Sequence, residues 1–381
     1  MGGLIMASTI NADTTNGVVV TSDTSGEIEL QSAGVTKAKI TSSGLQNASG
    51  SVITSQAGKN LIINGNMAID QRNSGASVTI PAASITYTLD RWFGYAAQAS
   101  KFTVQQNAGS VTPPSGFTNY IGATSSSSYS VGASDLFITS QRIEGLNTAH
   151  LAWGTADAKT VTLSFWVRSS LTGTFGGSVK NSAGNRSYPF SYTISSANTW
   201  EQKTITISGD TTGTWLTTNG IGIDLNFGLG AGASYVGTAG SWQSANLVSA
   251  TGATSVVGTS GATLYITGVQ LEVGTTATPF EHLQYGQQLA LCQRYFQTFS
   301  HAWVGVAAGV GYFQSVQGTF NTAMRTTPTT TRTGGTSTTR YPSSNWAVYT
   351  TTAQRLVSRM AAVSGGGNEG WTASGILEAE L

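Results

Sequence analysis

The chain has 381 residues, of which only 9% are charged, and its formal net charge is +1. A near-neutral chain without a basic patch lacks the electrostatic footprint of a nucleic-acid-binding protein, and no run of about 18 apolar residues is present to span a membrane. The sequence is rich in Gly, Ser and Thr and poor in the Glu and Lys that solvated helices carry, so it favours short β-strands joined by turns.

Residues 1–57 are expected to form a separate N-terminal attachment or assembly segment. Residues 27–30 and residues 37–40 both alternate polar and apolar side chains, and Ser32-Ala33-Gly34 lies between them. This pattern predicts a β-hairpin. The first residues of the chain are too few and too uncharged to be a secretory signal.

A three-residue loop in this hairpin would place Glu29 opposite Lys37 and gather Ile28 and Leu30 on the other face. An isolated hairpin is marginally stable in water, so this apolar face is expected to pack on something. Ile28 and Leu30 are therefore candidates for an interface with identical hairpins of neighbouring subunits. The alternative is that the hairpin packs on the main domain of its own chain.

Residues 58–282 are expected to form the main domain. Several segments show the two-residue alternation of half-buried strands, and their number and turn spacing predict a two-sheet β-sandwich. In one of them, Val161, Leu163, Phe165 and Val167 share one face. The predicted strands are residues 101–105, 135–142, 161–168, 201–207, 220–227 and 264–272.

Residues 283–299 predict one helix. Tyr285, Leu289, Cys292 and Phe296 recur at helical spacing and form an apolar stripe. A helix this short needs tertiary burial. Either it packs under its own sandwich or three copies meet on an axis, and in the second case these four residues would form an oligomer interface.

Residues 300–381 again resemble β-structure, with strands predicted around residues 303–306, 312–320, 346–349 and 371–374. The Thr-rich residues 326–340 are expected to loop outward. The one cysteine, Cys292, excludes an intrachain disulfide and a cysteine-based zinc site, so we predict no metal and no cofactor.

Two sequence motifs follow one another along the chain. The first contains Asn64-Gly65-Asn66-Met67, followed by Asp90-Arg91-Trp92. The second is residues 264–273, followed by residues 290–296. Their order and spacing resemble bacteriophage tail-fibre and related virion structural proteins, in which a carbohydrate-module-like jelly roll is followed by a linking helix and a C-terminal β tip.

The resemblance implies an all-β fold: an N-terminal β-hairpin segment (1–57), a jelly-roll β-sandwich (58–282), a short linking helix (283–299) and a C-terminal β-sandwich tip (300–381). It also implies a homotrimer that is made in the host cytoplasm and placed on the outer surface of the virion tail. The N-terminal segment would attach to other phage tail or virion proteins, and the particle would recognise a host cell-surface glycan.

A glycan binder needs aromatic faces for sugar rings and planar polar groups for the hydroxyls. In the main domain, Tyr235 and Trp242 lie in or beside a Gly/Ser/Ala-rich stretch, and Trp215 follows the turn-forming residues 210–213. Together with Asp224 and Asn226, these are the candidate glycan-binding residues. Related modules often hold a structural calcium ion, but Thr267 and Gly268 stand where many relatives have acidic residues, so calcium is not predicted.

Two charged motifs, Asp70-Gln71-Arg72 and Asp90-Arg91-Trp92, are interpreted as structural, because an Asp and an Arg beside the start of a strand usually bond backbone groups or each other. Signatures of hydrolases, metalloproteases and nucleotide-binding loops are missing from the sequence, as is a β-helix repeat. We therefore expect no catalytic residues and no enzymatic activity. The alternative functions are a capsid decoration, a head fibre or another purely structural virion protein, and a cellular carbohydrate-binding module.

Overall fold

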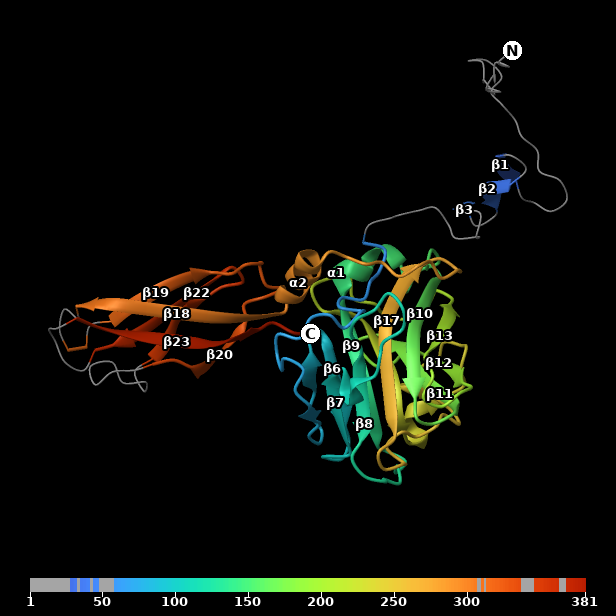
Figure 1. The fold of residues 1–381 in the computed structure, drawn as a ribbon, viewed down its shortest axis with the longest axis horizontal. Coiled ribbons are helices and arrows are strands. Elements are labelled where there is room, and N and C mark those ends of the chain that lie inside the picture. Colours follow the sequence, from blue (N-terminus) through green and yellow to red (C-terminus); the bar gives the residue numbers. More distant parts are fainter. Residues whose placement is uncertain are drawn as a thin grey trace, which may run out of the picture. The chain divides into compact units, whose positions relative to one another are not determined.

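The computed structural model describes residues 28–32, 35–41, 44–47, 58–306, 310–311, 313–336, 346–362 and 368–381. The chain divides into two units, Met1–Ala57 and Gly58–Leu381 (Figure 1). Across the described residues the dominant element is the antiparallel strand, and the α-helices are the short α1 (Gly145–Thr148) and α2 (Tyr285–Gln293). The predicted all-β class is confirmed. Neither helix is long and apolar enough to cross a membrane, as far as the described residues go.

The described part of the first unit is a three-stranded antiparallel sheet. Strand β2 (Val35–Thr41) lies between β1 (Ile28–Ser32) and β3 (Gly44–Asn47). The predicted hairpin is confirmed as β1–β2, and β3 was not predicted. On the open face of this sheet, Leu30 and Ile40 are exposed.

The register of the hairpin corrects the predicted one. Glu29 lies opposite Lys39, with an ion pair of 2.8 Å, and not opposite Lys37. The turn is one residue tighter than predicted, because Ser32 pairs with Val35, and an irregularity after Leu30 adds a second one-residue shift. A shift of one residue would move every side chain of the strand to the opposite face of the sheet. Because two such shifts occur, the apolar side chains stay on the face predicted for them.

The main domain of the second unit is a sandwich of two six-stranded antiparallel sheets (Figure 1). The chain crosses between the sheets repeatedly, so that the early strand β8 hydrogen-bonds to the late strand β17, which is the pattern of a jelly roll. The first sheet has the order β13 (Glu201–Ile207), β10 (Val161–Ser169), β17 (Thr263–Val273), β8 (Ile121–Ser125), β7 (Phe102–Gln106), β4 (Val78–Thr79). The second has the order β12 (Ser187–Ile194), β11 (Gly173–Lys180), β14 (Ile221–Ala231), β9 (Leu136–Glu144), β6 (Trp92–Ala96), β5 (Thr86–Leu89).

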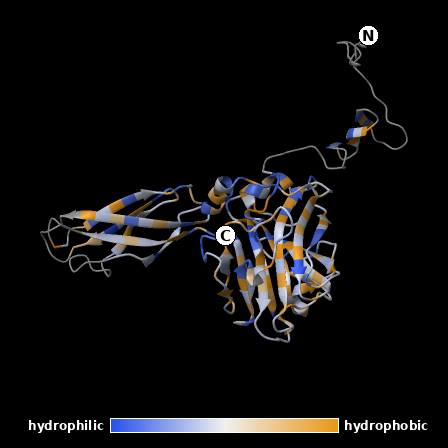
Figure 2. Cartoon of the chain, viewed as in Figure 1, coloured by the Kyte–Doolittle hydropathy of each residue, from blue (hydrophilic) through white to orange (hydrophobic). Residues whose placement is uncertain are grey.

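The core lies between these sheets and follows the alternation of their strands, which Figure 2 shows as bands of hydrophobic and hydrophilic residues. The predicted inward face of β10 is confirmed, since its four apolar side chains are fully buried. At the centre, the ring of Phe165 meets the rings of Tyr192 and Phe227 edge to face, with centroids 5.1 and 5.0 Å apart. Such contacts stabilise the core beyond the burial of area alone.

Residues 236–250 cross the outer face of the second sheet. They include the short parallel pair β15 (Val236–Gly237) and β16 (Ser249–Ala250). The backbone approaches β11 so closely that a Cβ atom on Gly176 would lie 2.4 Å from the Oγ atom of Ser249. Val248 is buried there against Phe93 and Ile138, so part of the outer face is covered by the chain itself.

Helix α2 is shorter than the predicted helix. It opens on a capping box between Gln284 and Gln287 and ends at Gln293. From Phe296 the chain continues as β18 (Phe296–Val306), which pairs along its whole length with β23 (Asn368–Glu378). This ladder of backbone hydrogen bonds replaces the last turns of the predicted helix.

The apolar stripe of α2 packs on its own chain. Cys292 is fully buried in a cluster with Ile63 and Ile69, and Phe296 is also buried. Neither residue is accessible to a second subunit, which corrects their prediction as interface residues. Leu289 is partly buried against the same cluster, whereas Tyr285 is 66% exposed and stays a candidate for a contact with another molecule.

The C-terminal domain, which follows α2, is a small sandwich of two three-stranded sheets. One has the order β18-β23-β20, and Trp371 of β23 is buried in its core. Residues 329–334 form a strand of this sheet, so the expectation of an outward loop over residues 326–340 is wrong there. The other strands are β20 (Thr329–Gly334) and, in the second sheet, β19 (Phe313–Thr319), β22 (Arg355–Ala361) and β21 (Trp346–Thr351).

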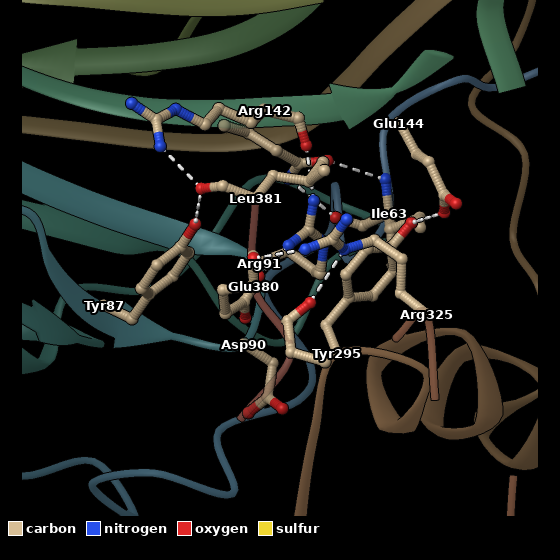
Figure 3. Close-up of polar contacts among 12 residues, drawn as sticks. Ile63, Tyr87, Asp90, Arg91, Arg142, Glu144, Tyr295, Arg325, Glu380 and Leu381 are labelled. Atoms are coloured by element: carbon tan, nitrogen blue, oxygen red, sulfur yellow. Dashed lines mark hydrogen bonds and ion pairs between the residues drawn. The ribbon is translucent and has the colours of Figure 1, made fainter. Parts of the chain in front are cut away.

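A buried ionic network joins the jelly roll to the end of the chain (Figure 3). The guanidinium group of Arg91 is only 1% exposed, forms an ion pair with Glu380 and lies 3.6 Å from the centroid of the Tyr295 ring. Arg72 donates to Glu380 at 2.8 Å and to Glu378 at 2.5 Å. We call these residues, with those that hold the backbone of residues 379–381, the arginine junction.

Two further arginines of the junction bind the backbone after β23. Arg142 donates to the oxygen of Leu381 at 2.5 Å, and Tyr87 donates to the same oxygen at 3.2 Å. Arg325 donates to the oxygens of Ala379 and Glu380 at 2.9 and 2.8 Å. The jelly roll and the C-terminal domain are therefore held together by charged groups that face each other inside the protein.

The two Asp–Arg motifs supply part of this network. Asp70 accepts hydrogen bonds from the backbone of Asn73 and Gly75, and Asp90 accepts two from Gln71, so the structural interpretation of both motifs is confirmed. Burial raises the pKa of Asp90 to about 6, against the opposing effect of the Gln71 hydrogen bonds. Asp90 is thus a buried carboxyl group that ionises at a cost in stability.

Replacement of Glu380 by Gln should lower the free energy of unfolding by about 3–5 kcal/mol, because Arg91 keeps a buried charge without a counter-charge. Urea unfolding followed by circular dichroism measures this. The matched control is Glu378→Gln, since Glu378 is more exposed and, among the described residues, pairs with Arg72 alone, and it should cost less than about 1 kcal/mol. Equal losses in the two variants would contradict a dominant role of the buried pair.

Asp90 should make the protein less stable as the pH rises. Its folded pKa, about 6, lies above the ordinary value of 3.8. Its contribution is therefore complete below pH 4 and lost as the pH rises through 6, by about 3 kcal/mol in total. Asp90→Asn should remove this part of the pH dependence, so the variant should gain melting temperature over the wild type at pH 8 but not at pH 4. A constant difference in calorimetric melting temperature would rule out this assignment.

Candidate functional site

Four aromatic side chains from separate segments meet at one place on the jelly roll. Trp153, Trp215 and Trp242 contact one another edge to face, with centroids 4.7, 5.3 and 5.4 Å apart. Tyr188 of β12 lies against Trp242 at 5.3 Å. We call these four residues the tryptophan cluster.

The local backbone explains how the cluster forms. Trp153 follows a 3₁₀ turn (Ala149–Leu151), and its indole Nε1 donates to the oxygen of Lys159 at 2.8 Å. Gly154 has φ +87° and donates its N–H to the oxygen of Asp210 at 2.7 Å. A Cβ atom at this position would lie 2.7 Å from the oxygen of Gly213, so only glycine allows the turn that carries Trp215 to come this close.

Asp210 is the polar centre of this arrangement. Its carboxylate accepts a bidentate pair from Arg186 at 2.8 and 2.6 Å, two hydrogen bonds from Thr212 and one from the indole of Trp215 at 3.3 Å. Burial opposes ionisation of Asp210, but Arg186 and Thr212 outweigh it, so its pKa lies below the ordinary value. The same pair raises the pKa of Arg186. The ion pair of Asp210 and Arg186, which we call the brace, therefore fixes the position of the loops that carry the aromatic rings.

The cluster presents part of its surface to solvent. Trp153 is buried, whereas Trp215 and Trp242 are half-buried. The indole N–H of Trp242 is bound to the oxygen of Ser208 at 2.8 Å, so the ring offers hydrocarbon surface and no free donor. Two exposed hydroxyl residues bond to the charged pair of the cluster, since Thr212 donates to Asp210 at 3.1 Å and Ser244 accepts from Arg186 at 3.2 Å. Aromatic surface beside hydroxyl and amide groups can take the C–H face of a sugar ring and bind its hydroxyls.

The structure brings only some of the predicted glycan-binding residues together. Trp215 and Trp242 touch, but Tyr235 lies elsewhere, against the buried Phe93, Ile138 and Val248. Tyr235 is half-buried like Trp215 and Trp242, but it packs on a different part of the sheet and does not join them.

Asp224 and Asn226 also require a correction. Both point to the outer face of β14, as their alternation with Leu225 predicts, but Asn226 is fully buried and Asp224 nearly so. Asp224 accepts from Ser140 at 2.8 Å and lies 3.8 Å from Lys180. Residues 236–250 cover this face, so neither side chain can reach a sugar in this structure.

Four residues of the site were not among the predicted ones: Trp153, Tyr188, Arg186 and Asp210. Their contacts depend on the fold, since Arg186 and Asp210 are 24 residues apart and lie on different loops. One local signal was present, because the turn residues Asp210-Thr211-Thr212-Gly213 directly precede Trp215. In the part of the chain that the structure describes, no group of three or more His, Cys, Asp and Glu side chains could hold a metal ion.

Neither a protein-family model nor a curated protein matches the chain. Solved structures with a similar fold include the enzymatically active domain of a tailspike protein from bacteriophage CBA120, which is 12% identical over 57% of this chain, with a TM-score of 0.29. The match spans 22% of that tailspike chain.

Carbohydrate-binding modules are also similar. A family 11 module from Clostridium thermocellum, in complex with a β-1,3-1,4-mixed-linked tetrasaccharide, is 12% identical over 54% of this chain and 98% of its own, with a TM-score of 0.26. A family 61 module in complex with β-1,4-galactotriose is 13% identical over 48% of this chain and 88% of its own, with a TM-score of 0.25. The strand order and register of the two sheets, and not these likenesses, establish the jelly roll.

Replacement of Asp210 by Ala should remove the ion pair with Arg186 that holds the tryptophan cluster in place. Arg186 and the indole of Trp215 would lose their shared acceptor, so the free energy of unfolding should fall by about 2–4 kcal/mol. Tryptophan emission should shift to longer wavelength as the indoles gain solvent. Asp157→Ala, which removes an exposed carboxylate, is the control and should change neither quantity. Unchanged emission in the Asp210 variant would show that the carboxylate does not order the rings.

Proposed function

We propose that this chain is a glycan-binding structural protein of a bacteriophage virion, of the tail-fibre type, and that it attaches the particle to the host surface. The observation that carries the proposal is the tryptophan cluster, in which Trp215 and Trp242 offer half-buried aromatic surface beside exposed hydroxyl and amide groups. The Asp210–Arg186 pair fixes the rings before a ligand arrives, which lowers the entropy cost of binding.

We propose that the glycan is bound and not cleaved. A glycosidase needs a carboxyl group that is free to exchange a proton or to attack the sugar. The carboxylate of the cluster, Asp210, already accepts five hydrogen bonds, which fills the roughly four lone-pair sites of its two oxygens. This saturation, together with its lowered pKa, suits a structural role.

The first unit supports the proposal of an assembly segment. Its sheet exposes Leu30 and Ile40 within the chain, and a small sheet of this kind gains stability when such a face is covered. We propose that copies of this sheet associate in a homotrimer, which attaches to other virion proteins on the outer surface of the tail. Three linked sites would raise the avidity for a surface glycan by about 10²–10⁴ without new contacts.

Binding of the full chain to an array of bacterial surface oligosaccharides tests the proposal. Trp242→Ala and Trp215→Ala should each weaken the binding at least tenfold, or about 1.4 kcal/mol, because each removes aromatic surface from the site. Trp166→Ala removes another half-buried indole, on β10 outside the cluster, and should leave the affinity unchanged. If the cluster variants bind like the wild type, or no glycan is bound, the proposed function is wrong.

A further inference from the structure

A cleft opens beside helix α2, and none of the four residues of the tryptophan cluster lines it. It has a volume of about 390 Å³ and lies between the first residues of the second unit, residues 146–150 after β9, and α2 with the residues that lead into it. Ligand-binding pockets typically have volumes of about 300–1,000 Å³, so the space suits one or two sugar rings. We call it the helix cleft.

The walls of the helix cleft combine apolar surface with amide groups. Leu61 and Ile62 are buried and supply an apolar floor, while Leu146, which is 55% exposed, and Leu291 stand at the rim. Asn147 and His150 are exposed and add polar groups to the lining. Such a lining suits a ligand that has both a small apolar group and several polar atoms.

The charge of the helix cleft points to a neutral ligand. Among the residues that line it, Glu281 is the only acidic one, and none is Lys or Arg. Each carboxylate oxygen of Glu281 already accepts one backbone hydrogen bond, from the N–H of Gly58 at 2.6 Å and of Asn60 at 2.9 Å, which ties this side chain to the lining backbone. An anionic ligand would find no Lys or Arg in the lining to pair with it, and a neutral ligand needs no counter-charge.

One lining residue points to a specific chemical group. Gln288 of α2 is only 7% exposed, and its side-chain Nε2 has no hydrogen-bond partner. Its neighbours Gln284 and Gln287 are engaged in the capping box of the helix. A buried amide donor without an acceptor is unfavourable and rare in folded proteins, so an acceptor from a ligand would complete the site.

We propose that the helix cleft binds an acetamido group carried by an N-acetylhexosamine unit. A rotation of the Gln288 side chain on binding exposes Nε2, which is buried in this structure, to the acetamido carbonyl oxygen, and the acetamido methyl group packs on Leu61 and Ile62. The sugar hydroxyls bond to Asn147 and His150 at the rim. The acetamido group is neutral, and its carbonyl oxygen is a strong acceptor beside a methyl group. These properties match the apolar floor of the helix cleft, the unpaired amide donor of Gln288 and a lining without Lys or Arg. This site is separate from the tryptophan cluster and does not depend on the function proposed for it.

Calorimetric titration of the full chain with N,N′-diacetylchitobiose tests the proposal, with cellobiose as the sugar that lacks acetamido groups. We expect binding of the first sugar only. Gln288→Leu keeps the bulk of the side chain but removes the donor, and it should weaken the binding at least tenfold. Gln293→Leu makes the same change on α2 outside the cleft lining and should have no effect. Thermal melting of both variants verifies that they are folded.

An acetamido group can also come from a peptide, so N-acetyl-alanine methylamide is titrated in parallel. Stronger binding of this peptide than of the sugar would overturn the carbohydrate assignment and make the cleft a peptide site. No binding of the sugar at millimolar concentration, equal binding of cellobiose, or an unchanged affinity in Gln288→Leu would each overturn the proposal. Trp242→Ala should leave this titration unchanged, so a failure here is distinct from a failure of the tryptophan cluster.

Discussion

The ion pair between Arg91 and Glu380 is the interaction on which the second unit depends. Charged residues are scarce in this chain, yet the arginine junction gathers four arginines around the residues that follow β23. Burying charge is costly unless each group is paired, so the junction forms only when the jelly roll and the last strand are both in place. The two parts are therefore expected to fold interdependently.

This constraint also explains the position of α2. The helix ends at Gln293, and the next residues, Arg294 and Tyr295, reach back to the jelly roll, where both donate to Glu144. Tyr295 also places its ring over Arg91. The chain can then leave as β18 only in a direction that lets it pair with β23, and Glu380 follows two residues after the end of β23. The linking helix is thus fixed by the junction and has no need of a trimer axis to bury its apolar side.

The sequence allowed the strands of the jelly roll to be predicted wherever apolar and polar side chains alternate along the strand. Residues 161–167 are such a case, because their alternation fits only a strand with the Val, Leu and Phe side chains on one face. The end of α2 could not be predicted, since Phe296 fits the apolar stripe of a helix as well as the inward face of a strand. The choice depends on β23, which lies about 80 residues further along the chain.

The site was predictable only in part for a related reason. Alternation shows that Asp224 and Asn226 share a face of β14, but it does not show that residues 236–250 cover that face. The contact of Trp215 with Trp242 depends on two loops, and the brace from Arg186 to Asp210 joins one of them to a third. The local sequence thus identified aromatic residues near turns, whereas the contacts between these residues depend on the tertiary structure.

The low charge of the chain and its aromatic cluster suit a ligand that is neutral, hydroxylated and repeated on a surface. Under the proposed function, its contacts would be spread over copies of the protein, with moderate affinity at each site. The brace beneath the rings serves such binding, because it holds a shallow aromatic surface in one conformation without the help of a deep pocket.

The most direct test of glycan binding at the tryptophan cluster is ¹⁹F NMR of the protein labelled with 5-fluorotryptophan, titrated with a bacterial surface polysaccharide. The resonances of Trp215 and Trp242 should shift with increasing ligand, whereas that of Trp371, buried in the C-terminal domain, should not. Shifts confined to tryptophans of residues 296–381, or no shift at saturating ligand, would contradict the account.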